Sequence, residues 1–149
     1  MNNFNMTYDG VVSCCEQIAQ SIKNNTWHGM YAPSLIVGVE RGGLIPAVHL
    51  SHLLNIPMDT LLWQTRDGTF KEREKTSMLA VIGAGGNVLV VDDINDSGTT
   101  LSEIDQCYGR ITTAALAERT SSKHKCNYVG MPIYQDIDWV IFPWEQKYE

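Results

Sequence analysis

Short apolar runs and segments with helical spacing alternate along most of this chain. The apolar runs predict strands, and they cover residues 35–39, 58–63, 88–91 and 111–117. Apolar residues at helical spacing predict a helix over residues 8–24, and we expect further helices over residues 44–54 and 101–107. Strands that alternate with helices indicate a parallel sheet that is covered on both faces. We therefore expect an α/β fold, with a parallel, Rossmann-like sheet flanked by helices.

Two regions do not follow this alternation. Residues 64–77 are polar and dense in charge, with no apolar period. A loop of that length in a compact domain is usually functional or mobile. Residues 128–144 mix prolines and aromatic side chains without a clear period, which predicts a small irregular lobe.

The strand at 88–91 leads into an unusual group of polar residues. Asp92 and Asp93 follow where the apolar run ends, and Asp96-Ser-Gly-Thr-Thr100 stands where a helix should begin. In open α/β sheets, ligands bind at the carboxyl ends of strands. Hydroxyls, a glycine and the free N–H groups of a helix start suit a phosphate, while adjacent carboxylates suit sugar hydroxyls or Mg²⁺. The segment predicts a site for a phosphorylated sugar with a metal.

An ordinary helix cap is the alternative interpretation of this segment, with Asp96 or Ser97 as the N-cap residue. A cap, however, does not need three aspartates and three hydroxyls together.

A second segment, Gly38–Pro46, also joins a strand to a helix. Gly42 and Gly43 allow the backbone to approach an anion closely, and Arg41 adds positive charge. This pattern suits pyrophosphate, although a tight turn alone would also explain it.

Composition narrows the class of protein. The 149 residues fit one domain, and a net charge of −6 argues against a general binder of nucleic acids or membrane surfaces. We expect no signal peptide and no membrane span, because the chain has no suitable apolar stretch. The four cysteines show no C-x-x-C spacing, so we expect reduced thiols in a cytoplasmic protein.

The segment Val88–Leu101 resembles the phosphoribosyl pyrophosphate motif of type I phosphoribosyltransferases. Arg41–Pro46 resembles the pyrophosphate loop of the small bacterial xanthine–guanine phosphoribosyltransferases, which implies a cis peptide bond between Glu40 and Arg41. Thr7–Asp9 and Trp139–Glu145 also have counterparts in that family, so the resemblance covers nearly the whole chain. It implies a single phosphoribosyltransferase domain over residues 1–149, with a small C-terminal hood, mainly residues 118–149, that holds the base.

The resemblance also implies a role for each site residue. The 5′-phosphate is expected on the cradle Ser97, Gly98, Thr99 and Thr100. Asp92 and Asp93 are expected to hold the ribose hydroxyls directly or through Mg²⁺. Pyrophosphate is expected on Glu40, Arg41, Gly42 and Gly43 with that metal. Asp96 is expected to act as the catalytic base, and the purine is expected between hood residues that include Trp139 and Val140.

The chain departs from the family at the base site and in the loop. In the family, a lysine binds the 6-oxygen of the purine. Here that position is occupied by Glu118 or Arg119, depending on a one-residue choice in the alignment with the family. Arg119 would donate to a 6-oxopurine, whereas Glu118 would favour the amino group of adenine. The 64–77 loop lacks the family's Ser-Tyr pair, although Lys71, Arg73 and Lys75 would still cover pyrophosphate.

We expect a purine phosphoribosyltransferase that uses phosphoribosyl pyrophosphate, Mg²⁺ and a 6-oxopurine, and that forms a homo-oligomer, either a dimer or a tetramer. The same reaction on adenine or a pyrimidine is one alternative. A non-catalytic regulator of this fold is another, and the acidic net charge and the presence of Asp96 disfavour it.

Overall fold

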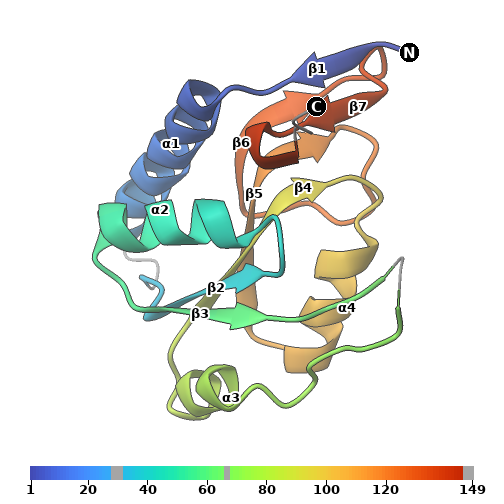
Figure 1. The fold of residues 1–149 in the computed structure, drawn as a ribbon. Helices are drawn as coiled ribbons and strands as arrows, with labels where there is room; N and C mark the ends of the chain where they lie inside the picture. Colours follow the sequence, from blue (N-terminus) through green and yellow to red (C-terminus); the bar gives the residue numbers. More distant parts are fainter. Residues whose placement is uncertain (28–31, 66–67, 146–149) are drawn as a thin grey trace.

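A central sheet of five parallel strands runs through the described part of the chain, which comprises residues 1–27, 32–65 and 68–145 of a computed structural model (Figure 1). In spatial order its strands are β3 (Met58–Leu61), β2 (Leu35–Val39), β4 (Val88–Asn95), β5 (Ile111–Arg119) and β6 (Tyr128–Ile133). All four pairings between neighbours are parallel. The predicted sheet is confirmed.

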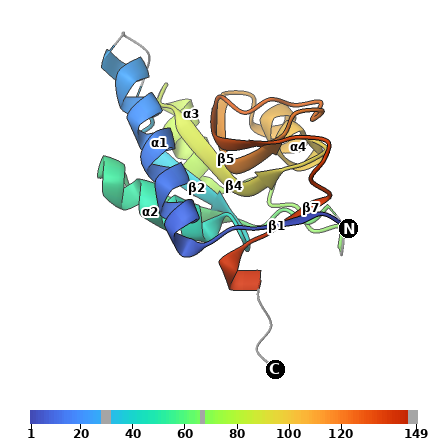
Figure 2. The same ribbon diagram turned by 90° about the horizontal axis from the view of Figure 1, so that it is seen from above.

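Helices cover both faces of this sheet, as Figure 2 shows from above. They are α1 (Tyr8–Trp27), α2 (Leu44–Leu54), α3 (Thr76–Gly83) and α4 (Thr99–Tyr108). Alternate side chains of β4 pack on opposite faces of the sheet. Leu89 and Val91 pack into one apolar core with α1 and α2, while Val88 and Val90 pack into a second core with α3 and α4. Burial of the strand on both faces explains its continuous apolar run. None of the described helices is long and apolar enough to cross a membrane.

Among the elements that differ from the sequence-based expectation are β4, α3 and β6. β4 does not end before its acidic pair but continues to Asn95, because Asp92 and Ile94 still pair with β5. Helix α3 lies partly within the expected 64–77 loop, and it buries only Met78 completely. β6 belongs to the main sheet, so the expectation of an irregular lobe beginning at residue 128 was wrong.

Gly130 explains how β6 packs against α1. A Cβ atom on this glycine would lie 2.5 Å from the Cβ of Cys14, so any larger residue would push the helix away. The close approach allows the helix to cover the last strand of the sheet.

A second, two-stranded sheet stands beyond the carboxyl end of β4 (Figure 1). It pairs β1 (Asn3–Asn5) with β7 (Trp139–Ile141) in parallel, so the start of the chain contributes to the predicted hood. Phe142, which follows β7, is buried in the main core and stacks on Trp144 at 4.9 Å between ring centroids. A 3₁₀ helix, Pro143–Glu145, ends the described chain. These contacts hold the two-stranded sheet beside the strand ends, where the hood was predicted.

Candidate active site

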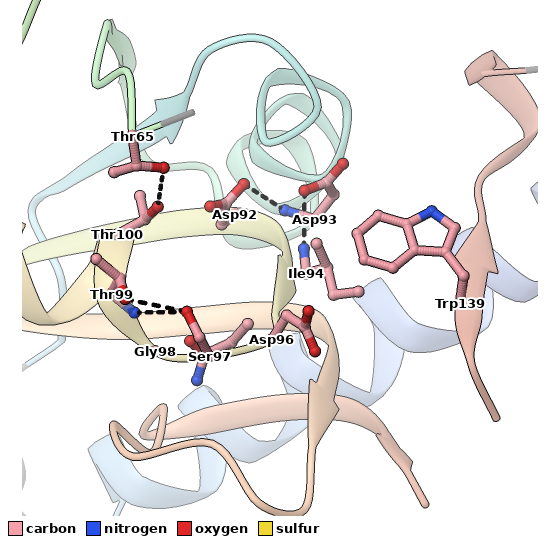
Figure 3. A pocket seen from close by; sticks show the side chains of 11 residues that line it. Thr65, Asp92, Asp93, Ile94, Asp96, Ser97, Gly98, Thr99, Thr100 and Trp139 are labelled. Atoms are coloured by element: carbon pink, nitrogen blue, oxygen red, sulfur yellow. Dashed lines mark hydrogen bonds between the residues drawn. The ribbon is translucent and has the colours of Figure 1, made fainter. Parts of the chain in front are cut away.

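A cavity of about 260 Å³ lies where β4 ends and α4 begins (Figure 3). The predicted acidic and hydroxyl residues share it with one hood residue and one residue from the segment after β3. Its lining comprises Thr65, Asp92, Asp93, Ile94, Asn95, Asp96, Ser97, Gly98, Thr99, Thr100 and Trp139. The structure therefore brings most of the predicted phosphate and sugar residues into one pocket.

The loop before α4 has the form of an anion cradle. Gly98 is the N-cap residue and has a φ of 93°, and the Thr99 amide donates to the Ser97 hydroxyl at 3.3 Å. A Cβ there would lie 2.6 Å from the backbone nitrogen of His124, so both the conformation and the packing require glycine. The hydroxyls of Ser97 and Thr99 lie 3.0 Å apart at the mouth of the helix. The observed N-cap is thus neither Asp96 nor Ser97, which the alternative interpretation predicted. The amides in the first turn of α4 suit a phosphate.

Asp92 and Asp93 form a compact acidic pair in the floor of the pocket. Asp92 Oδ1 accepts a hydrogen bond from the Asp93 amide, and Asp93 Oδ1 accepts one from the Ile94 amide, each at 2.8 Å. Burial raises the pKa of Asp92 well above its ordinary value, and the neighbouring Asp93 charge raises it further. Burial also raises the pKa of Asp93, against the opposing hydrogen bonds from Asp92 and the Ile94 amide. Positive charge or hydroxyl donors placed here would stabilise both carboxylates.

The second predicted motif borders a neighbouring cavity of about 660 Å³. Arg41, Gly42 and Asp93 line it together with residues of the C-terminal segment, so Asp93 faces both cavities. The predicted cis bond between Glu40 and Arg41 is present. A Cβ on Gly42 would lie 1.9 Å from Asp93 Oδ2, and one on Gly43 would lie 2.4 Å from the Val91 carbonyl. The glycines therefore seat this loop directly against the acidic strand.

Ile94 and Trp139 face each other across the pocket in Figure 3, and the carboxylate of Asp96 lies beside the gap between them. A flat apolar ring fits between an aliphatic side chain and an indole. Val140, by contrast, is fully buried in the main core, so its side chain does not reach the pocket.

Neither Glu118 nor Arg119 belongs to the lining of this pocket. Glu118 Oε1 accepts hydrogen bonds from Asn95 Nδ2 at 2.8 Å and from the Cys126 amide at 2.7 Å, and its side chain lines a different groove beside α1. Arg119 forms an ion pair with Asp96. Both candidates thus contact a residue of the lining: Glu118 contacts Asn95, and Arg119 contacts Asp96, the expected catalytic base.

Thr65 was missed by the sequence reasoning. Its hydroxyl lies 3.1 Å from that of Thr100, which closes the pocket from the side of the 64–77 segment. A single threonine in a polar loop carries no pattern that would have indicated this position.

The three cations expected to cover pyrophosphate make contacts outside the two cavities. Lys71 forms an ion pair with Glu103 at 2.9 Å, the Arg73 guanidinium lies 5.4 Å from the ring centre of Trp63, and Lys75 lies 3.5 Å from Asp59. Arg66 and Asp67 lie outside the described residues. The expectation that this segment covers pyrophosphate stays a prediction.

Fold and site together define an α/β protein with a pocket at its strand ends that suits a phosphorylated sugar. The family described as the phosphoribosyl transferase domain matches residues 9–149. The chain therefore belongs to the phosphoribosyltransferase family.

Individual relatives agree with this assignment. The chain is 30% identical over 146 residues to the xanthine-guanine phosphoribosyltransferase of Vibrio vulnificus, which covers 97% of this chain and 90% of that protein. It is also 30% identical over 132 residues to the enzyme of that name from Cereibacter sphaeroides, with 85% of this chain and 74% of the relative covered.

Among solved structures, the purine phosphoribosyltransferase from Pyrococcus horikoshii has a TM-score of 0.72 and 25% identity, covering 100% of this chain and 97% of that one. A Helicobacter pylori xanthine-guanine-hypoxanthine phosphoribosyltransferase has a TM-score of 0.68 at 20% identity, covers 97% of this chain and 94% of that one, and shows the same fold. The predicted family, fold class and enzyme class are confirmed.

Proposed function

We propose that the protein transfers the 5-phosphoribosyl group from phosphoribosyl pyrophosphate to a 6-oxopurine, which is hypoxanthine, guanine or xanthine, and releases pyrophosphate. One observation carries the proposal: a single pocket unites a phosphate cradle, an acidic pair and an aromatic slot. The relatives named for xanthine and guanine support the choice of base.

Different residues of the pocket bind different parts of the substrate. The hydroxyls and amides of Ser97–Thr100 bind the 5′-phosphate, which fixes the sugar through groups remote from the reacting carbon. Asp92 and Asp93 bind the ribose hydroxyls and place negative charge near the cation-like sugar of the transition state. Arg41 and the amides of the loop at residues 40–43 bind pyrophosphate from the neighbouring cavity.

Magnesium fits the acidic pair as a cofactor shared with the substrate. Mg²⁺ usually takes one or two carboxylates and completes its shell with phosphates and water. Asp92 and Asp93 supply two carboxylates whose pKa values are raised by burial, so a bound cation would stabilise their charged forms. No group of three or more metal-binding side chains occurs in the described residues, so pyrophosphate would supply the remaining ligands. Asp92 and Asp93 would hold the ion where it would neutralise charge on the leaving pyrophosphate.

The base occupies the slot between Ile94 and Trp139. Trp139 stacks on the purine, and Asp96 accepts its ring proton as the new bond to the ribose carbon forms. Arg119 donates to the 6-oxygen, and a guanidinium carries more N–H groups than the contacts of Arg119 with protein acceptors use.

The protein is proposed to act as a cytoplasmic homo-oligomer, a dimer or tetramer. The outward face of α2 supports self-association, because Val48 is 43% exposed and Leu53 is 39% exposed on a helix without Asp, Glu, Lys or Arg. All four cysteines are unpaired, in keeping with a reducing compartment. Sedimentation of a monomer at micromolar concentration would remove the oligomer from the proposal.

The decisive experiment incubates the protein with Mg²⁺, phosphoribosyl pyrophosphate and one base at a time: hypoxanthine, guanine, xanthine, adenine or uracil. We expect nucleotide and pyrophosphate in equal amounts with the 6-oxopurines. Faster turnover of adenine would overturn the choice of base. Tight binding of phosphoribosyl pyrophosphate without turnover of any base would instead favour the regulator.

A further inference from the structure

Arg119, the last residue of β5, connects the pocket to the hood. Its Nε donates to Asp96, its Nη1 donates to the Ile137 carbonyl at 3.0 Å, and its Nη2 donates to the Asp138 carbonyl at 3.1 Å. The side chain is 19% exposed, so these bonds form in a partly desolvated place. One guanidinium thus joins the proposed catalytic carboxylate to two consecutive carbonyls of another segment.

Those two carbonyls immediately precede Trp139. Within the turn that carries them, the Ile137 amide donates to the Tyr134 carbonyl at 3.1 Å, and the Asp138 amide donates to the Asn2 carbonyl of the N-terminal segment at 2.9 Å. β7 itself pairs only with the short strand β1 in the described chain. Arg119 is therefore a direct side-chain link between β7's entry turn and the end of the main sheet.

We infer that Arg119 is a positioning residue that holds both Asp96, beside the base slot, and the turn before Trp139, which forms one wall of that slot. This inference rests on the proposed function and deepens it. The planar fork of a guanidinium can satisfy three acceptors in fixed directions, whereas an ammonium is a point charge on a flexible stem. Lysine at this position would pair with Asp96 or donate to a 6-oxygen, but it would not hold the two carbonyls as well.

Arg119→Lys therefore separates positioning from base recognition. We expect the KM for the 6-oxopurine to rise roughly 10-fold or more, as the loss of charge-assisted hydrogen bonds would predict. The KM for phosphoribosyl pyrophosphate should stay unchanged, because the cradle does not contact Arg119. Amide hydrogen exchange in residues 137–141 should become faster in the variant.

The matched control is Arg110→Lys, on an exposed residue in the turn before β5. It should leave both KM values and the exchange of residues 137–141 as in the wild type. In Arg119→Ala, added guanidinium at millimolar concentration should restore part of the affinity for the base, whereas added ammonium should not.

Two results would overturn the inference. One is an Arg119→Lys variant with wild-type KM for the base, and the other is a raised KM with unchanged hydrogen exchange, which would make Arg119 only a direct contact of the base. A wild-type protein that forms no nucleotide refutes the proposed function instead, and the exchange measurement still tests the link to the hood.

Discussion

Gly42→Ala tests whether the pyrophosphate loop and the acidic pair form one site. A Cβ at this position would lie 1.9 Å from Asp93 Oδ2, whereas ordinary contacts begin at 3.4 Å, so the carboxylate would have to retreat by about 1.5 Å. The variant would retain the Asp93 carboxylate, but the carboxylate would be displaced and would lose its hydrogen bond from the Ile94 amide.

The size of the effect follows from that displacement. A misplacement of 1 Å in a reacting or binding group can cost about 10²-fold in rate. We therefore expect kcat/KM for phosphoribosyl pyrophosphate to fall about 10²-fold, with a higher Mg²⁺ concentration needed for half-maximal rate. The assay is initial-rate formation of pyrophosphate at saturating 6-oxopurine over a series of Mg²⁺ concentrations.

Gly83→Ala is the matched control. Gly83 is the last residue of α3, and a Cβ there would meet nothing within 4 Å. This variant should keep wild-type kinetics, with equal or slightly higher stability. If Gly42→Ala also keeps wild-type kcat/KM and Mg²⁺ dependence, the seating of Asp93 against the loop does not define the site.

Further predictions concern the other site residues. Since burial raises the pKa of Asp92, the folded protein should lose stability as pH rises from the ordinary Asp range through that raised pKa. Asp92→Asn removes this loss, so without Mg²⁺ its free energy of unfolding in urea at neutral pH should exceed that of the wild type while nucleotide formation falls sharply; equal stability at acidic and neutral pH in the wild type would contradict this. Asp96→Ala should lower kcat by roughly 10²-fold or more with a smaller effect on binding of phosphoribosyl pyrophosphate, and a variant that loses that binding but keeps its kcat would refute the role as a base. Trp139→Ala should raise the KM for the purine, and an unchanged KM would exclude stacking. Hydrogen exchange in residues 68–75 should slow only when both substrates are bound, and equal protection in both states would argue against a lid.

Much of the fold could be predicted because its signals are local. The strand Leu35–Val39 and the helix Leu44–Leu54 have the predicted bounds, since a buried parallel strand needs a continuous apolar run and a surface helix needs an apolar face. The cradle and the acidic pair were also predictable, because phosphate and sugar need glycine, hydroxyls and carboxylates within a few residues of one strand end.

Elements stabilised by distant partners gave a weaker signal. Helix α3 buries only one residue completely, Met78, so its sequence shows little amphipathic spacing. β6 is defined by pairing with β5 and by the approach of α1 at Gly130, neither of which is visible in its own six residues.

The sequence by itself determined the family, the sheet and the residues proposed to bind phosphate and sugar, because these depend on short contiguous motifs. Only the tertiary structure decided which side chains complete the pocket. Thr65 meets Thr100 across 35 positions of sequence, and Arg119 meets Asp96 across 23. Such contacts depend on how loops from different strands converge at one edge of the sheet, and no local pattern of apolar and polar residues encodes that convergence.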